Sequence, residues 1–137
     1  MTERTAAEQR RLDHVLEMYR EVLINMDSSK VDHYLPPHYV QHSSLAPPGL
    51  QALKDFLDKV RVESPDASQT IKRAFVDGDH VIVHVHVIRF RGDPGLAVVD
   101  IFRLENERIV EHWDVLQEVP ATPLNPNSMF DGGVIEL

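Results

Sequence analysis

The chain has 137 residues, of which 42% are hydrophobic and 26% are charged, with no cysteine and a net charge of −8. This length predicts a single domain over residues 1–137, and the lack of cysteine excludes disulfides and thiolate chemistry. The negative charge, without a Lys/Arg cluster, argues against nucleic acid and anionic membrane surfaces as partners. No apolar run matches a membrane span, and the charged N-terminal segment does not resemble a secretory signal, so we expect a cytoplasmic protein.

Helical spacing of apolar residues dominates the first half of the chain. Apolar residues recur every three or four positions over residues 5–26, which predicts an amphipathic helix with one buried stripe. A short helix is expected over residues 31–35, ended by Pro36 and Pro37, and a third helix over residues 50–60. Between them lie the segment Tyr39-Val-Gln-His42 and a Pro/Gly loop.

The second half of the chain changes to the alternating pattern of β-strands. It predicts a meander of four strands over residues 68–76, 81–90, 96–104 and 108–119. In the last turn, Asn106 is the residue that best tolerates a positive φ. Helices followed by strands predict an α+β fold, in which helices cover one face of a twisted antiparallel sheet. The Pro- and Asn-rich tail, residues 121–137, is expected to wrap around this body.

Ionisable side chains interrupt the apolar faces of the last two strands. By alternation, Asp100 shares a face with Phe102, and His112 shares a face with Asp114 on the next strand. Carboxylates and imidazoles among apolar side chains need hydrogen-bond partners, unless they take part in ligand binding or catalysis. These positions therefore predict the floor of a pocket. Trp113 has the opposite parity and is expected to pack on the other face.

The strand over residues 81–90 has two apolar faces, so alternation alone does not decide which face lies beneath the helices. One face carries valines at positions 81, 83, 85 and 87, and the other carries His84 and His86 with Ile82 and Ile88. We favour the histidine face as part of the pocket, with the valine face, joined by Trp113, in contact with a second subunit. The alternative places the valines in the core and the histidines in water.

On the favoured interpretation, imidazoles and carboxylates from three strands converge on one concave surface: His84, His86, Asp100, His112 and Asp114. Such groups in an apolar cavity are the usual parts of general acid–base catalysis. The His-x-His pattern with Asp and His nearby is also a ligand set for zinc or iron, although the glycine-framed motifs of metal barrels are absent.

Three stretches carry a resemblance to a known family: Tyr39-Val-Gln-His42, the Pro-Pro-Gly loop before the third helix, and Val99-Asp-Ile-Phe-Arg103 followed by Arg108-Ile-Val-Glu-His-Trp-Asp114. Together they resemble the SnoaL-like polyketide cyclases of the nuclear-transport-factor-two-like superfamily, from the first helix to about Pro120. The resemblance implies a cone-shaped α+β barrel with a strongly curved antiparallel sheet. It also implies N-terminal helices that close a deep pocket, and often a homodimer through the convex face of the sheet.

The resemblance also implies roles for two aspartates. In the cyclases, an aspartate on the last strands is the general acid/base of an intramolecular aldol condensation that needs no metal or organic cofactor. By motif position this aspartate is Asp114, and Asp100 occupies the facing position, where the cyclases imply an imidazole. Related epoxide hydrolases carry Arg and Asp on the strand that here bears His84 and His86, so their mechanism is not expected.

We therefore expect a cofactor-independent enzyme that acts next to a carbonyl group of a small organic substrate. Asp114 would move the proton, His86 or His112 would stabilise the developing enolate oxygen, and Asp100 would orient the imidazole. The expected substrate contacts are His42, Gln41, Tyr39, His84 and Phe102. The alternatives are a non-catalytic module that binds a small ligand, and a metal-dependent enzyme built on the His/Asp cluster.

Overall fold

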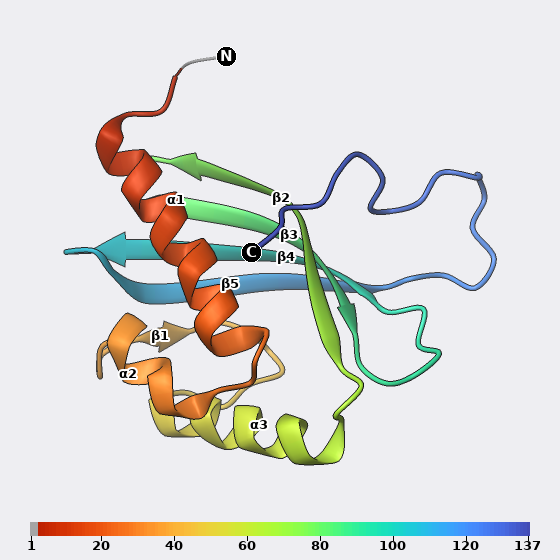
Figure 1. Cartoon of the computed structure of the whole chain (residues 1–137), viewed down its shortest axis with the longest axis horizontal. Helices are drawn as coiled ribbons and strands as arrows, with labels where there is room; N and C mark the ends of the chain where they lie inside the picture. Colours follow the sequence, from red (N-terminus) through yellow and green to blue (C-terminus); the bar gives the residue numbers. More distant parts are fainter. Residues whose placement is uncertain (1–2) are drawn as a thin grey trace.

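A computed structural model describes residues 3–137; Met1 and Thr2, where the charged N-terminal segment starts, lie outside the described residues. Figure 1 shows the helices gathered on one face of a strongly curved sheet. The sheet has five strands in the order β1-β5-β4-β3-β2. The architecture is the predicted cone-shaped α+β barrel, with the core between the helices and the concave face of the sheet. No helix within residues 3–137 is long and apolar enough to span a membrane.

The first predicted helix is divided into two parts. Helix α1 (Ala6–Met18) begins at a capping box in which Thr5 and Glu8 bond each other's backbone N–H groups. The chain then continues as a π-helical turn over Tyr19–Leu23. Because a π turn inserts an extra residue, it changes the direction of the side chains around it, and such turns are frequent at functional sites. Tyr19 and Val22 of this turn are fully buried against the sheet.

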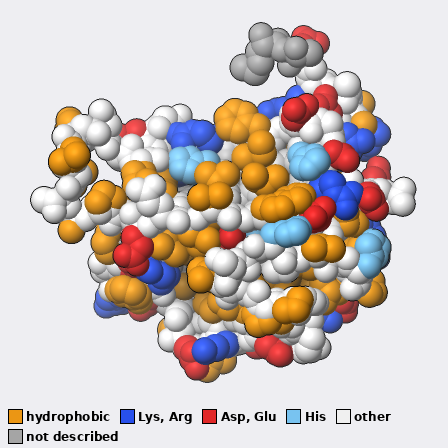
Figure 2. Space-filling view, turned by 180° about the vertical axis from the view of Figure 1, so that it is seen from behind, with side chains coloured by type: hydrophobic (Ala, Val, Ile, Leu, Met, Phe, Trp, Pro, Cys, Tyr) orange, Lys and Arg blue, Asp and Glu red, His pale blue; other side chains and the backbone are white. Residues whose placement is uncertain are grey.

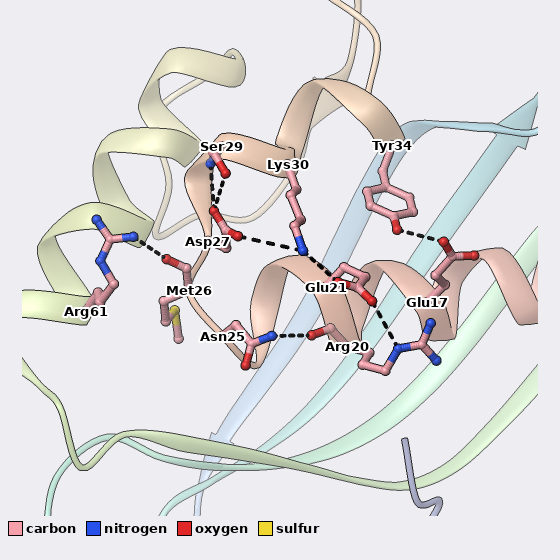
Figure 3. A network of polar contacts seen from close by, with 10 residues as sticks. All are labelled: Glu17, Arg20, Glu21, Asn25, Met26, Asp27, Ser29, Lys30, Tyr34 and Arg61. Carbon is pink, nitrogen blue, oxygen red and sulfur yellow. Dashed lines mark hydrogen bonds and ion pairs between the residues drawn. The ribbon is translucent and has the colours of Figure 1, made fainter.

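Short polar contacts connect α1 and the π turn to the segments that follow them (Figure 3). The Lys30 ammonium lies 2.8 Å from Glu21, and the Tyr34 hydroxyl donates to Glu17 at 2.9 Å. Helix α2 (Val31–Tyr34) is a single turn, and α3 (Leu50–Glu63) is the third predicted helix. Exposed ion pairs contribute little stability individually, so we ascribe the placement of these helices mainly to their buried apolar side chains.

The four predicted strands form the antiparallel meander: β2 (Ser68–Asp77), β3 (His80–Ile88), β4 (Leu96–Glu105) and β5 (Arg108–Glu118). The β4–β5 turn has positive φ at both central residues, 49° at Asn106 and 62° at Glu107. Positive φ at both positions characterises a type I′ turn, whose twist matches that of the flanking strands. The expectation for Asn106 is confirmed, and Glu107 adopts a conformation that non-glycine residues seldom take.

The sequence did not predict strand β1 (Val40–Gln41), because two residues are too few to show a period. β1 pairs in parallel with β5, placing Val40 opposite Glu111 and Gln41 opposite His112. The sheet is therefore not purely antiparallel. This pairing carries the Tyr39-Val-Gln-His42 segment to the edge of the strand that bears His112 and Asp114.

The valines of β3, not its histidines, lie beneath the helices. Val81, Val83 and Val85 are completely buried in the core formed with α1. The favoured interpretation of this strand is wrong. The alternative is correct for the valines, whereas the histidines are half-buried and do not lie fully in water. Burial of the valines removes apolar surface from water, whereas imidazoles on that face would need buried partners for their nitrogen atoms.

His84 and His86 lie on the convex face, where the C-terminal tail covers them. The Phe130 ring stacks on His86 at 4.0 Å and on His84 at 5.7 Å between ring centroids. Arg73 donates to the carbonyl groups of Phe130 and Asp131. Farther along the tail, the backbone N–H of residue 135 donates to the carbonyl of residue 71 at 2.8 Å.

Candidate active site

A cavity of about 440 Å³ lies between the helices and the concave face of the sheet. Side chains from the π turn, α3 and β4 give it mostly apolar walls, including Val22, Leu57 and Val98. The polar groups that concern its chemistry are Tyr39, Gln41, Asp100, His112 and Asp114. A small-molecule site usually has this combination of apolar walls and a few convergent polar groups, within about 300–1,000 Å³.

The strand register brings the predicted acids together. Asp100 of β4 pairs directly with Asp114 of β5, and Phe102 pairs with His112 in the neighbouring position. Residues that face each other in an antiparallel pair lie on the same side of the sheet. Asp100 and His112 are each only 9% exposed. The predicted convergence of Asp100, His112 and Asp114 is therefore present in the structure.

Both oxygen atoms of Asp100 have hydrogen-bond partners. Oδ1 lies 2.8 Å from Nε2 of His112, and Oδ2 accepts a hydrogen bond from the hydroxyl group of Tyr19. Burial, followed by the charge of Asp100, raises the pKa of Tyr19 well above its ordinary value, so the hydroxyl keeps its proton and donates. Sequence reasoning missed this role for Tyr19, although a tyrosine within a buried helical stripe usually has a partner for its hydroxyl.

Strand β1 supplies the partner for the other nitrogen of His112. Nδ1 lies 2.7 Å from Oε1 of Gln41, which also accepts the backbone N–H of Ser43 at 2.9 Å. The amide nitrogen of Gln41 donates to the Tyr39 hydroxyl at 3.0 Å. The Phe102 ring stacks on the imidazole, with 4.8 Å between centroids. His112 is therefore held on both nitrogen atoms and on one ring face.

Asp114 differs from the other polar groups of the floor. Its Oδ1 atom is buried, yet it has no hydrogen-bond partner among residues 3–137. Burial first, and then the charges of Asp100 and Asp114, raise the pKa of Tyr39, so this hydroxyl also stays protonated. The floor thus combines an unpartnered carboxylate oxygen with a neutral phenol that can donate.

The structure separates His42 from the substrate cavity. Its ring stacks parallel to Trp113 at 5.0 Å between centroids, and its Nε2 lies 2.7 Å from a carboxylate oxygen of Glu111. Because side chains alternate along β1, Gln41 points toward the cavity and His42 points away from it. The expectation that His42 lies at the pocket is wrong. Trp113 was expected on the face of the β3 valines, and this expectation is also wrong. Trp113 pairs with Ile101 of β4, which pairs with Ile82 on the histidine face of β3, so Trp113 lies on the convex face.

His84 and His86 are also outside the cavity. Arg73 contacts Nδ1 of His84, and Nε2 of His86 lies 2.9 Å from the carbonyl oxygen of Pro94. Burial, with Arg73 and Lys72 nearby, lowers the pKa of His84. The expectation that these two histidines belong to the pocket is therefore wrong, since they lie on the opposite side of the sheet.

Asp100, His112 and Asp114 could also hold a cation, because one ligand atom from each lies within 4.8 Å of the others. Carboxylate and imidazole ligands suit iron, zinc or manganese. Without a cation, Asp100 and His112 are in direct hydrogen-bond contact, so that a proton lies between them.

The fold is shared with several solved structures. TsrD from Streptomyces laurentii is 23% identical, with 83% of this chain and 91% of that chain covered at a TM-score of 0.58. A provisionally named SnoaL-like polyketide cyclase from Jannaschia sp. CCS1 is 16% identical, with 85% and 91% covered at a TM-score of 0.69. IdmH from Streptomyces antibioticus is 21% identical, with 77% and 91% covered at a TM-score of 0.61.

A search of curated proteins found no match. The profile of the SnoaL-like domain matches residues 15–112, which include the π turn, β1 and most of the cavity floor. The chain therefore belongs to the SnoaL-like domain family.

Proposed function

We propose that this protein is a cofactor-independent acid/base enzyme that acts next to a carbonyl group of a small organic substrate, with Asp114 as the general acid/base. The observation that carries the proposal is the buried Oδ1 atom of Asp114, which has no partner within residues 3–137 and borders the cavity. A carboxylate oxygen that is free of protein partners is available to accept a proton from a bound molecule.

In the proposed reaction, Asp114 removes a proton from the carbon next to the substrate carbonyl. The electron pair of the broken C–H bond moves into the carbonyl group and produces an enolate. The enolate carbon then attacks a second carbonyl of the same molecule, and Asp114 returns its proton to the new alkoxide. In a substrate without a second carbonyl, Asp114 would instead return the proton to a different carbon atom of the enolate system, which is an isomerisation.

Tyr39 is the proposed donor to the enolate oxygen. Its own oxygen accepts from Gln41, so its hydroxyl hydrogen remains available to the cavity. The raised pKa of Tyr39 keeps this hydrogen in place. We assign the donor role to Tyr39 instead of His112, because both nitrogen atoms of His112 are already engaged. One such donor in a dry site contributes roughly 3–4 kcal/mol to transition-state stabilisation.

Proton exchange next to a carbonyl tests the proposal without knowledge of the natural substrate. Ring-containing ketones and 1,3-dicarbonyl compounds would be incubated in deuterated water, and the loss of the α-proton signal would be followed by NMR. We expect the wild type to accelerate exchange for members of the panel, and Asp114→Asn to lose about 10²–10⁴-fold of that acceleration. Asp55→Asn, at an exposed position of α3, is the matched control.

Three outcomes would contradict this proposal. Equal exchange by the wild type and Asp114→Asn would remove Asp114 from the reaction. A wild type that binds panel members, as seen by shifts of cavity resonances, but exchanges none would favour a non-catalytic ligand-binding module. Stoichiometric zinc or iron in the purified protein, with exchange abolished by its removal, would favour the metal-dependent alternative.

We also propose a homodimer through the convex face of the sheet. Figure 2 shows hydrophobic side chains gathered on this face and bordered by histidine and charged groups. Phe75 is 55% exposed and Val115 is 65% exposed. Half-buried Ile82, Ile101 and Trp113 continue the row of Phe75 across the sheet, and Val115 follows two residues after Trp113 on the same face of β5. An apolar patch rimmed by polar residues is typical of an interaction site. Arg103 and Glu111 pair with each other within the chain and form part of its polar border.

A further inference from the structure

The side chain of Gln41 is oriented by hydrogen bonds at both ends. Its oxygen accepts the backbone N–H of Ser43 at 2.9 Å, and its nitrogen donates to the Tyr39 hydroxyl at 3.0 Å. A backbone N–H can only donate. If the Gln41 amide were turned round, its NH₂ group would face the N–H of Ser43, and two donors would face each other. The position of the Gln41 oxygen is therefore fixed by the chain itself.

This oxygen determines which nitrogen of His112 carries hydrogen. Nδ1 of His112 lies 2.7 Å from the Gln41 oxygen, and an amide oxygen only accepts, so Nδ1 must donate. In a neutral imidazole, Nε2 would then present a lone pair to Oδ1 of Asp100, 2.8 Å away. Two acceptors at hydrogen-bond distance repel each other unless a proton lies between them.

We infer that Gln41 is a positioning residue that holds His112 in the Nδ1–H form and thereby keeps one shared proton between His112 Nε2 and Asp100 Oδ1. The hydroxyl of Tyr19 supports the same arrangement, because it donates to the other oxygen of Asp100. This inference about proton placement stands on the hydrogen bonds alone, and its catalytic consequence rests on the proposed function.

The catalytic consequence concerns Asp114. Asp100 and Asp114 face each other across β4 and β5, and two free carboxylates there would repel each other. The shared proton balances the charge of Asp100, so Asp114 faces a neutral pair. The same amide also leaves the Tyr39 hydrogen free to donate into the cavity. Gln41 thus sets the proton positions on the His112–Asp100 pair and on the Tyr39 hydroxyl, without contacting the reacting carbon.

Imidazole nitrogen NMR tests the inference on the free protein, with ¹⁵N-labelled histidine at neutral pH. The chain has eight histidines, and the His112 signals would be identified by their loss in His112→Gln. We expect the wild type to show a protonated Nδ1 on His112. Gln41→Met, which removes the acceptor, should lose the Nδ1–H signal and gain an Nε2–H that donates to Asp100. Gln41→Glu, which restores an acceptor, should recover the Nδ1–H signal.

His42→Ala is the matched control, because it changes the neighbouring residue of the same segment on the opposite face of the sheet. We expect it to leave the His112 signals unchanged. A wild type whose His112 has a bare Nδ1 would overturn the inference, as would a folded Gln41→Met variant that keeps Nδ1–H. If Gln41→Met fails to fold, the wild type and Gln41→Glu decide the question. The NMR test uses no substrate, so its result concerns only the proton positions on His112. The proposed function is refuted by a different result, namely full exchange activity of Asp114→Asn.

Discussion

Asp100 and Asp114 occupy directly opposed positions of β4 and β5, yet only Asp100 has both oxygen atoms partnered. Asp114 keeps a buried oxygen without a partner in the part of the chain that the structure describes. Elements outside the two strands contribute to the difference, because Tyr19 comes from the π turn, and Gln41 of β1 holds His112 of β5. We propose that Asp100 has a structural role, in which it holds the side chains of the cavity floor in place, and that Asp114 is the group that reacts with the substrate.

The two aspartates should respond oppositely to replacement by asparagine. Asp100→Asn disrupts a buried charged network, and we expect it to lower the free energy of unfolding by about 3–5 kcal/mol. Asp114→Asn changes a carboxylate oxygen that has no partner within residues 3–137, so the free energy of unfolding should stay within about 1 kcal/mol of wild type or rise. Urea titrations followed by circular dichroism would measure both, with exposed Asp55→Asn as the reference. Equal destabilisation by the two changes would contradict the division of roles.

Stability should decrease in alkaline solution because all three tyrosines have raised pKa values. Burial is the leading cause for Tyr19, Tyr39 and Tyr34, and together with the hydrogen bond to Glu17 it raises the pKa of Tyr34 to about 12. The unfolded chain releases these protons near pH 10 while the folded protein retains them. Above about pH 10 the free energy of unfolding should therefore fall by up to about 1.4 kcal/mol per pH unit for each tyrosine that remains protonated.

Tyrosinate absorbance would follow these ionisations directly. The folded protein should show little tyrosinate near pH 10, and the urea-unfolded chain should show the ordinary transition. Tyr19→Phe should reduce the slope of stability against pH. A normal tyrosine titration in the folded protein would argue against the buried network around Asp100.

Phe130 of the tail should control the titration of His84. The pKa of His84 is lowered by burial, then by Arg73 and Lys72, and the Phe130 ring covers the histidine. Phe130→Ala should therefore move this pKa upward, toward the ordinary value. A histidine whose pKa is lowered in the folded state contributes stability at pH values above the ordinary histidine pKa. This stability is lost as the pH falls below that pKa.

NMR titration of the histidines would measure the shift, with Leu124→Ala, at a fully exposed position of the same tail, as the control. We also expect the wild type to lose more stability than Phe130→Ala between neutral pH and pH 5. An unchanged His84 titration in Phe130→Ala would mean that the tail does not protect this site in solution.

A charge on the convex face should dissociate the proposed dimer. Val115 lies 65% exposed on this face, so Val115→Asp places a carboxylate at the proposed contact without disturbing the core. We expect light scattering at micromolar concentration to give a dimer for the wild type and a monomer for Val115→Asp. Leu124→Asp carries the same charge on the tail and should remain dimeric. A monomeric wild type would refute the proposal.

Alternation correctly grouped the residues within each of the last two strands. Asp100 and Phe102 share a face of β4, and His112 and Asp114 share a face of β5, as predicted. The first and third helices and the four longer strands contain enough residues to show their periods, and Pro36 and Pro37 marked the end of the short second helix. For β3 the pattern was equally apolar on both faces, and the packing of α1 against Val83 and its neighbours decided the orientation. That choice moved His84 and His86 out of the proposed site.

The amino-acid pattern was sufficient for the α+β class and for the faces that Asp100 shares with Phe102 and His112 shares with Asp114, because parity is a local property of each strand. The register of β4 with β5 then brings the two faces together. Tertiary structure alone decided the partners of these side chains. Tyr19 lies 81 residues from Asp100 in sequence, and Gln41 lies 71 residues from His112. A two-residue parallel strand and a π turn bring them together. The strand is too short to show a period, and the helical pattern of residues 5–26 does not reveal the π turn within it. The long-range hydrogen bonds thus distinguish the partnered aspartate from the unpartnered one.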